Sequence, residues 1–276
     1  MYQENVVLLE KYIDHMVARN KSPKTIKTFR SILNKFIKYI GDKDLKDINI
    51  QDIDGFLAFL RRNGYSPKSI YTAAVALKRF LEYHEIIEPL KNFEYPRRPS
   101  TLPRFLTYEE VYKMIDVAER IRDKLIIMLL YTTGIRVSEL VNIKIMDINF
   151  EKNSIRVYGK GGKEREVFFS RHVKPLLKKI IRRRHPTEYL FKSRGDKHIS
   201  YVTVERIVRK IALKAGIYKK VTPHILRHSF ATHALMKGMN LREIQELLGH
   251  ASLKNTQIYA HIVRRKLYED YSKIWD

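Results

Sequence analysis

A stretch rich in proline and arginine, residues 95–104, constrains most strongly how this chain can fold. Its three prolines each remove a backbone donor and clash with a preceding helical turn, so no helix can run through it. Apolar residues at helical spacing occur on both sides of the stretch, and extended proline-rich chain acts as a semi-rigid spacer. We therefore expect two domains, residues 1–94 and 105–276, joined by this linker.

Residues 1–94 predict four short helices. Two of them begin with the same signature, Ser22-Pro23 and Ser66-Pro67, in which a capping serine precedes proline at the first helical position. KSPKTI and YSPKSI thus look like two copies of one helical hairpin unit. The helix between them, residues 51–62, is expected to end at Asn63-Gly64. Lysines near these helix starts can meet phosphate or can simply be solvated; they are Lys21, Lys24, Lys27 and Lys68.

The second domain is expected to be mostly helical around one small β region. Thr107-x-x-Glu110 is a capping box, and residues 121–131 are apolar nearly all round, which predicts a central helix. Residues 143–169 predict the one β region, with a turn at residues 149–153 and a glycine-rich hairpin tip at residues 159–163 between strands at 154–158 and 164–169. The predicted fold is mostly α in two domains, the second being α+β with a small three-stranded antiparallel sheet.

The chain is strongly basic. It has 54 Lys and Arg against 30 Asp and Glu, a formal net charge of +24, and residues 1–94 hold only 16 of the basic and 12 of the acidic side chains. A field of this strength attracts polyanions, and duplex DNA is the most densely charged of them. An ordinary basic surface or a contact with anionic lipid is the alternative. The lipid contact is weaker because no separate basic amphipathic helix is present.

Other features of composition narrow the class of protein. There is no cysteine, which excludes disulfides, thiolate catalysis and zinc sites built on cysteine. The first residues are acidic where a signal peptide is basic, and the longest apolar run, residues 125–131, is too short for a bilayer. We expect a cytoplasmic, nucleoid-associated protein that does not contact membranes.

Two motifs place basic side chains at helix starts. In TTGIRVSEL, Arg136 follows a predicted helix end, and alone it reads as an ordinary surface arginine. In TPHILRHSFATH, Thr222 caps a helix and His224, Arg227 and His228 share one face. Two histidines at this spacing can chelate zinc, but no third ligand motif is evident and the arginine would repel a cation. An anion site, where guanidinium and imidazole address one phosphate, is the better interpretation.

The remaining candidates complete a chemical set. LLGHASLKNTQIYAH contains His250 and, nine residues later, Tyr259, while Lys160 lies at the hairpin tip. Arginines, histidines, a lysine and a tyrosine suit phosphoryl transfer to a phenolic oxygen. No Asp/Glu cluster indicates a two-metal nuclease, and GKGGK lacks the spacing of a nucleotide-binding loop. We expect neither metal nor cofactor.

TGIRVSEL, GKGGKER, HILRHSFATH and LLGH followed by tyrosine together resemble the tyrosine recombinase (integrase) family, closest to its Xer branch of archaeal type. The resemblance covers the whole chain. It implies a SAM-like core-binding domain in residues 1–94 and a catalytic domain in residues 105–276. It also implies that Arg136 and Arg227 bind the non-bridging oxygens of the scissile phosphate, and that His250 hydrogen-bonds the same phosphate.

The resemblance assigns the proton transfers and the covalent step to the other candidates. Tyr259 would be the nucleophile, His224 would act in proton transfer with it, and Lys160 would protonate the departing 5′-oxygen. Glu139 and His228 would support these groups. Strand exchange through a 3′-phosphotyrosyl intermediate and a Holliday junction implies a homotetramer on a double-stranded DNA site, with a C-terminal exchange helix at about residues 262–274.

Three alternatives remain: a type IB topoisomerase, a mobile-element integrase and a non-catalytic DNA-binding protein. The helical first domain and the long segment after Tyr259 favour a recombinase over a topoisomerase. No arm-binding domain precedes residue 1, which favours chromosome dimer resolution over a mobile element. The complete set of six candidate residues argues against a non-catalytic protein. The target sequence and any accessory protein cannot be read from the chain.

Overall fold

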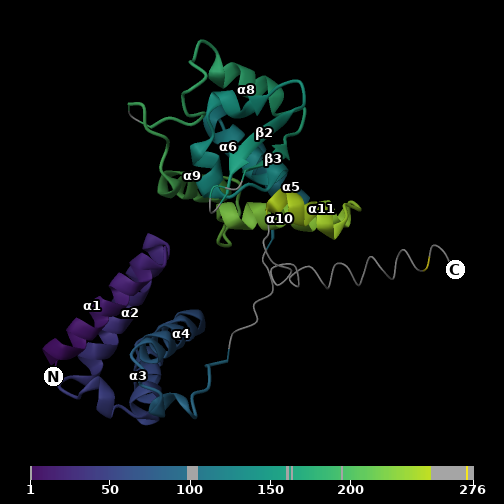
Figure 1. The fold of residues 1–276 in the computed structure, drawn as a ribbon. Coiled ribbons are helices and arrows are strands. Elements are labelled where there is room, and N and C mark those ends of the chain that lie inside the picture. Colours follow the sequence, from purple (N-terminus) through teal and green to yellow (C-terminus); the bar gives the residue numbers. More distant parts are fainter. Residues whose placement is uncertain are drawn as a thin grey trace. The chain divides into compact units, whose positions relative to one another are not determined.

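The computed structural model describes residues 2–97, 105–159, 162, 164–193, 195–249 and 272. The chain divides into two compact units, residues 1–101 and 102–276 (Figure 1). Linker residues 98–104 and the expected exchange helix at residues 262–274 lie, apart from residue 272, outside the described residues.

The described residues of unit 1, 2–97, form four α-helices, as the sequence predicts, and two short 3-10 turns. Both Ser-Pro signatures form as expected, with the hydroxyl of each serine accepting a 3.2 Å hydrogen bond from the backbone N–H three residues later. The elements are α1 (Tyr2–Ala18), α2 (Pro23–Ile40), η1 (Leu45–Asp47), α3 (Ile50–Arg62), α4 (Pro67–Tyr83) and η2 (Glu88–Leu90).

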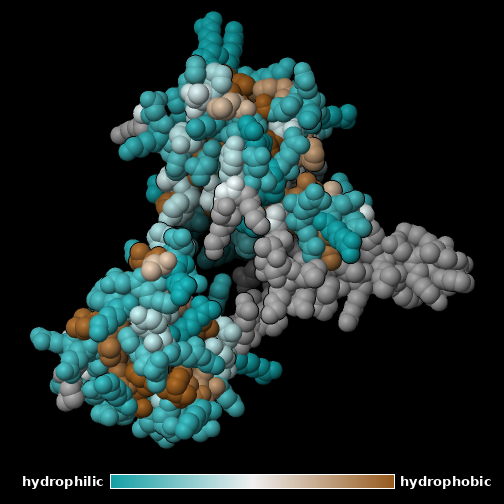
Figure 2. Space-filling view, viewed as in Figure 1, coloured by the Kyte–Doolittle hydropathy of each residue, from teal (hydrophilic) through white to brown (hydrophobic). Residues whose placement is uncertain are grey.

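Unit 1 has a hydrophobic core of its own. Phe36 from α2 and Phe56 from α3 meet edge to face at 5.2 Å, and Phe80 from α4 is also fully buried. Burying one such ring contributes roughly 1.5–3 kcal/mol. Apolar side chains also reach the surface of this unit, whereas hydrophilic residues cover most of the visible surface of unit 2 (Figure 2).

Unit 2 surrounds a three-stranded sheet with helices, which confirms the predicted fold class. Its elements are α5 (Tyr108–Asp116), α6 (Ile121–Thr133), α7 (Val137–Asn142), η3 (Ile145–Asp147), β1 (Ile148–Asn149), β2 (Ser154–Tyr158), β3 (Glu164–Phe168), α8 (Lys174–Ile181), α9 (Tyr201–Lys214), α10 (Pro223–Met236) and α11 (Leu241–Leu248). None of the described helices is both long and apolar enough to cross a membrane.

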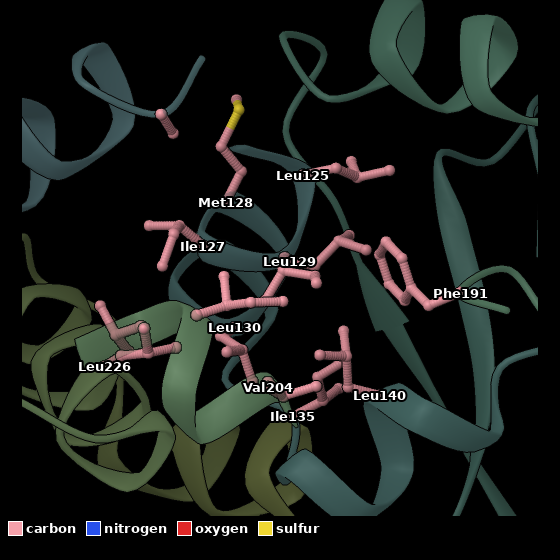
Figure 3. Close-up of a cluster of buried hydrophobic side chains, with 14 of the residues drawn as sticks. Leu125, Ile127, Met128, Leu129, Leu130, Ile135, Leu140, Phe191, Val204 and Leu226 are labelled. Atoms are coloured by element: carbon pink, nitrogen blue, oxygen red, sulfur yellow. The ribbon is translucent and has the colours of Figure 1, made fainter. Parts of the chain in front are cut away.

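Helix α6 is central to unit 2, as its apolar sequence predicts. Residues 125–130 are all buried, so no side of this part of the helix faces solvent. Figure 3 shows Leu129 and Leu130 of α6 meeting Val204 of α9 and Leu226 of α10. The helix that carries two of the candidate residues, α10, is therefore fixed against the core.

The sheet is antiparallel with the order β1-β2-β3. Ser154 pairs with Phe168 and Tyr158 with Glu164, so the hairpin tip begins at residue 159 as predicted. Side chains alternate along β2, with Ile155 and Val157 on the buried face. Strand β3 ends at Phe168, one residue earlier than the sequence suggested.

Candidate active site

Three of the six candidate residues are described by the structure. Arg136 lies at the N-cap position of α7, and His224 and Arg227 lie in the first two turns of α10. Lys160, His250 and Tyr259 lie outside the described residues.

Arg136 is held at the start of α7 by Glu139. Its backbone N–H donates to Oε2 of Glu139 at 2.8 Å, and its Nη1 donates to Oε1 at 2.9 Å. Its Nη2 donates to the carbonyl oxygen of Gly249 at 3.2 Å. The Arg136 side chain is 39% exposed, so the guanidinium is oriented by the protein yet accessible to an anion.

Arg227 is buried, with 4% of its surface exposed. Its Nη1 donates to the carbonyl oxygen of Gly134 and its Nη2 to that of Leu248, both at 2.7 Å. Hydrogen bonds from an ionised donor are stronger than neutral ones, and two of them fix the plane of the guanidinium. The side chain therefore lies in one orientation between the end of α6 and the end of α11.

The two arginines meet at the end of α11. Arg227 and Arg136 bond the carbonyls of consecutive residues, Leu248 and Gly249. Gly249 ends the helix in the left-handed conformation, with φ of 61°. The two guanidinium groups therefore lie at the end of α11. The next residue in the sequence is the candidate His250.

His224 lies in the first turn of α10, where Thr222 caps the helix by accepting a hydrogen bond from the N–H of Ile225. Its exposed ring meets His228 edge to face, with ring centres 4.2 Å apart. Among the described residues no group of three or more His, Asp or Glu is arranged to hold a metal ion. An exposed imidazole one turn from Arg227 suits proton transfer near a bound phosphate.

Arg165 belongs to this site, although the sequence alone did not single it out. Arg165 of β3 donates from Nη1 and Nη2 to the two carboxylate oxygens of Glu139, each at 2.8 Å, and from Nε to the carbonyl of Leu247 at 2.8 Å. Burial pushes the pKa of Glu139 upward, but hydrogen bonds from Arg165 and from Arg136 outweigh burial and hold it below its ordinary value. Glu139 is therefore ionised between two arginines.

The far end of α10 is anchored to α5 and α6 through His233. The imidazole stacks on the ring of Tyr108 at 3.8 Å, and its Nδ1 shares a 2.8 Å hydrogen bond with the hydroxyl of Tyr131. Burial lowers the pKa of His233, and the charge of Lys237 lowers it further. A neutral imidazole thus belongs to the folded state.

A basic groove runs along α9 to the start of α10. Its lining includes Arg206, Arg209, Lys219 and Lys220, together with the ring of Tyr218, which is 86% exposed. Guanidinium and ammonium groups are the side-chain groups that contact the phosphates of nucleic acid. The groove reaches Thr222, two residues before His224.

Residues 104–265 match the phage integrase family, and residues 8–88 match the N-terminal SAM-like domain of phage integrases. The first match covers more than half of the chain. The chain belongs to the phage integrase family. This recombinase therefore combines the SAM-like helical domain expected from the sequence with an integrase catalytic domain.

Relatives extend the similarity over nearly the full chain. Tyrosine recombinase XerA of Pyrococcus furiosus is 43% identical over 95% of this chain and 92% of its own length. The crystal structure of XerA recombinase is 35% identical, with a TM-score of 0.56 and 99% of both chains covered. The structure of XerH site-specific recombinase, bound to palindromic difH substrate in a post-cleavage complex, is 28% identical, with a TM-score of 0.78 over 96% of this chain and 83% of that chain.

These findings establish the class of reaction. The chain is a site-specific tyrosine recombinase and catalyses DNA strand cleavage and rejoining. Similarity to recombinases over the full length disfavours the type IB topoisomerase as an alternative.

Proposed function

We propose that this recombinase cleaves DNA through Tyr259, with Arg136 and Arg227 on the non-bridging oxygens of the scissile phosphate. The observation that carries the proposal is the pair of hydrogen bonds from these two arginines to Leu248 and Gly249. Both guanidinium groups are thereby placed at the residues that precede His250, which is nine residues before Tyr259.

The chemistry follows from this charge arrangement. The phenolic oxygen of Tyr259 attacks phosphorus as His224 takes its proton, and the 5′-oxygen leaves with a proton from Lys160. Negative charge spreads over the equatorial oxygens in the transition state, where fixed cations and a hydrogen bond from His250 lower the barrier. The phosphotyrosyl bond conserves the energy of the phosphodiester, so rejoining by a 5′-hydroxyl needs no ATP.

We propose double-stranded DNA as the partner of basic surfaces on both units. In unit 2 the groove beside α10 presents two arginines and two lysines. In unit 1 a second groove is lined by Lys24, Lys27 and Lys35 at the starts of helices and along α2. Cations that contact phosphates release counterions, so affinity for DNA should fall steeply with salt.

Exchange of two duplexes requires four strand cleavages, and each chain supplies one nucleophile. We therefore propose a homotetramer on DNA that passes through a Holliday junction, acting in chromosome dimer resolution at the nucleoid. The C-terminal residues 262–274 would dock on a neighbouring protomer. Deleting residues 263–276 should then leave DNA binding by one protomer intact and abolish recombination between two sites.

The central test is a covalent complex that depends on one tyrosine. Sequencing the DNA recovered with the Tyr259→Phe protein from cells defines the site, and a nicked substrate of that site traps the cleaved state. Wild-type protein should give a covalent band on a denaturing gel, and Tyr259→Phe should bind equally well and give none. Tyr112→Phe is the matched control, because Tyr112 is exposed on α5 and lines neither basic groove. A band from Tyr259→Phe at the wild-type level contradicts the assignment.

A further inference from the structure

Arg165 joins three segments that are distant in sequence: the hairpin strand β3, helix α7 and the end of α11. We propose that Arg165 is a positioning residue for DNA cleavage, which acts through Glu139 to hold Arg136 in place. The inference rests on the proposed role of Arg136 at the scissile phosphate. It adds a residue for which the motifs of the sequence gave no role.

Holding Glu139 in this way requires the planar guanidinium group of arginine, with its several N–H donors. Two nitrogens of Arg165 meet the two oxygens of Glu139, while the third reaches the carbonyl of Leu247, and all three contacts are 2.8 Å. A lysine offers one ammonium at the end of a flexible stem and cannot span both partners in this geometry. Because 14% of the Arg165 side chain and 2% of the Glu139 side chain are exposed, water competes little with these bonds.

The carboxylate of Glu139 connects Arg165 to Arg136, because it accepts hydrogen bonds from both arginines. Oε1 of Glu139 accepts from Nη1 of both arginines, and Oε2 accepts from Arg165 and from the backbone N–H of Arg136. Both the main chain and the guanidinium of Arg136 are thus bonded to one carboxylate. Fixing that carboxylate from the opposite side fixes Arg136, and the two guanidinium groups together leave a net positive charge for an incoming phosphate.

Close packing at Gly249 supports the same arrangement. A Cβ atom at Gly249 would lie 3.2 Å from Cδ, Nε and Cζ of Arg165, tighter than ordinary van der Waals contact. The absence of a side chain there lets Arg165 lie against the backbone whose carbonyl accepts from Arg136. Arg165 therefore touches both groups that hold Arg136, namely the carboxylate of Glu139 and the end of α11.

The test is a double-substitution cycle on the rate of covalent complex formation, at saturating protein and with a nicked substrate. Arg165→Lys keeps the charge but loses the fork, and it should lower the rate by about tenfold or more while DNA affinity changes little. In an Arg136→Ala background, Arg165→Lys should lower the rate of covalent complex formation by less than a further factor of about three, because the group that Arg165 positions is gone. Arg156→Lys, on the neighbouring strand and half exposed, is the matched control and should cleave normally.

A purely structural role gives a different result. Loss of folded protein would lower the rate by the same factor in both backgrounds, and melting temperatures recorded for each variant show its extent. Equal factors, or Arg165→Lys within about threefold of the wild-type rate, overturn the proposal. Arg165→Gln is run in parallel, so that poor folding of one variant does not decide the outcome. Failure of the proposed function gives a different result from failure of the proposal for Arg165, because the wild-type protein itself would then form no covalent complex through Tyr259.

Discussion

Arg227 donates a 2.7 Å hydrogen bond to the carbonyl oxygen of Gly134, although 93 residues separate them in the sequence. A second bond of the same length joins Arg227 to Leu248. The guanidinium is therefore oriented by the protein itself, and in its proposed role at the scissile phosphate it would need no reorientation. Electrostatic stabilisation of a transition state is strongest where the donors are preorganised in this way.

Arg227→Lys should distinguish the effect of the guanidinium's orientation from the effect of its positive charge. The lysine retains a cation but reaches one of the two carbonyls at a time, so we expect DNA binding within several-fold of wild type. Cleavage at saturating protein should fall by about 10²–10³, the usual cost of removing one preorganised donor. Single-turnover formation of the covalent complex measures the rate. A rate equal to wild type would show that orientation by Gly134 and Leu248 is not needed.

Gly134→Ala should disturb both stability and the site. Gly134 has φ of 63°, and a Cβ there would lie 2.4 Å from Cδ1 of Phe230 and 2.8 Å from Cδ2 of Leu248. A non-glycine residue in this conformation costs about 1–3 kcal/mol before any clash is counted. Gly216→Ala is the matched control, because φ is 75° there and nothing lies within 4 Å of the added atom. Thermal unfolding of Gly134→Ala should occur at a lower temperature than that of the control; equal melting would contradict the packing account.

Much of the fold could be predicted because its signals are local. The Ser-Pro helix starts, the capping box of Thr107 and Glu110, and the glycine hairpin each depend on residues within a few positions of one another. The apolar sequence of α6 likewise predicts a central helix, since no side of it can face water. Local physical chemistry decides these features, and the structure confirms them.

The details of the site could not be predicted, because they depend on contacts across the chain. The acceptors of Arg227 lie 93 and 21 residues away, and Arg165 meets Glu139 over 26 residues. Arg165 ends the GKGGKER motif, but nothing in that motif separates its role from that of the other charged residues of the hairpin, such as Lys163. The catalytic roles of all six candidate residues remain predictions from the resemblance to tyrosine recombinases.

Cleavage should proceed without divalent metal. The described part of the chain arranges no cluster of three His, Asp or Glu, and the two groups proposed to meet the phosphate, Arg136 and Arg227, are cations. We expect the rate of covalent complex formation to change by less than about twofold in excess chelator, because in the proposed mechanism arginines take the place of a metal at the phosphate oxygens. Denaturing gels with and without chelator measure the effect. Activity that disappears on chelation and returns with magnesium would contradict the arginine assignment.

The stability of unit 2 should depend on pH through His233. The pKa of His233 is lowered in the folded protein, chiefly by burial beneath Tyr108 and Tyr131, from an ordinary value of 6.5. In the window between the lowered and the ordinary value, the unfolded chain binds more protons than the folded one. The contribution of neutral His233 to the free energy of unfolding is therefore fully present above the unfolded pKa, and it is lost as the pH falls through this window.

Replacing His233 should remove that part of the pH dependence. Between about pH 7 and pH 5 the melting temperature of the wild-type protein should fall further than that of His233→Gln, because only the wild-type protein loses the neutral imidazole as the pH falls. His84 in unit 1 also has a lowered pKa, but it is present in both proteins and cancels in the comparison. His185→Gln, at an exposed position, is the control and should follow the wild-type curve. Parallel curves for wild type and His233→Gln would show that protonation of His233 does not oppose folding.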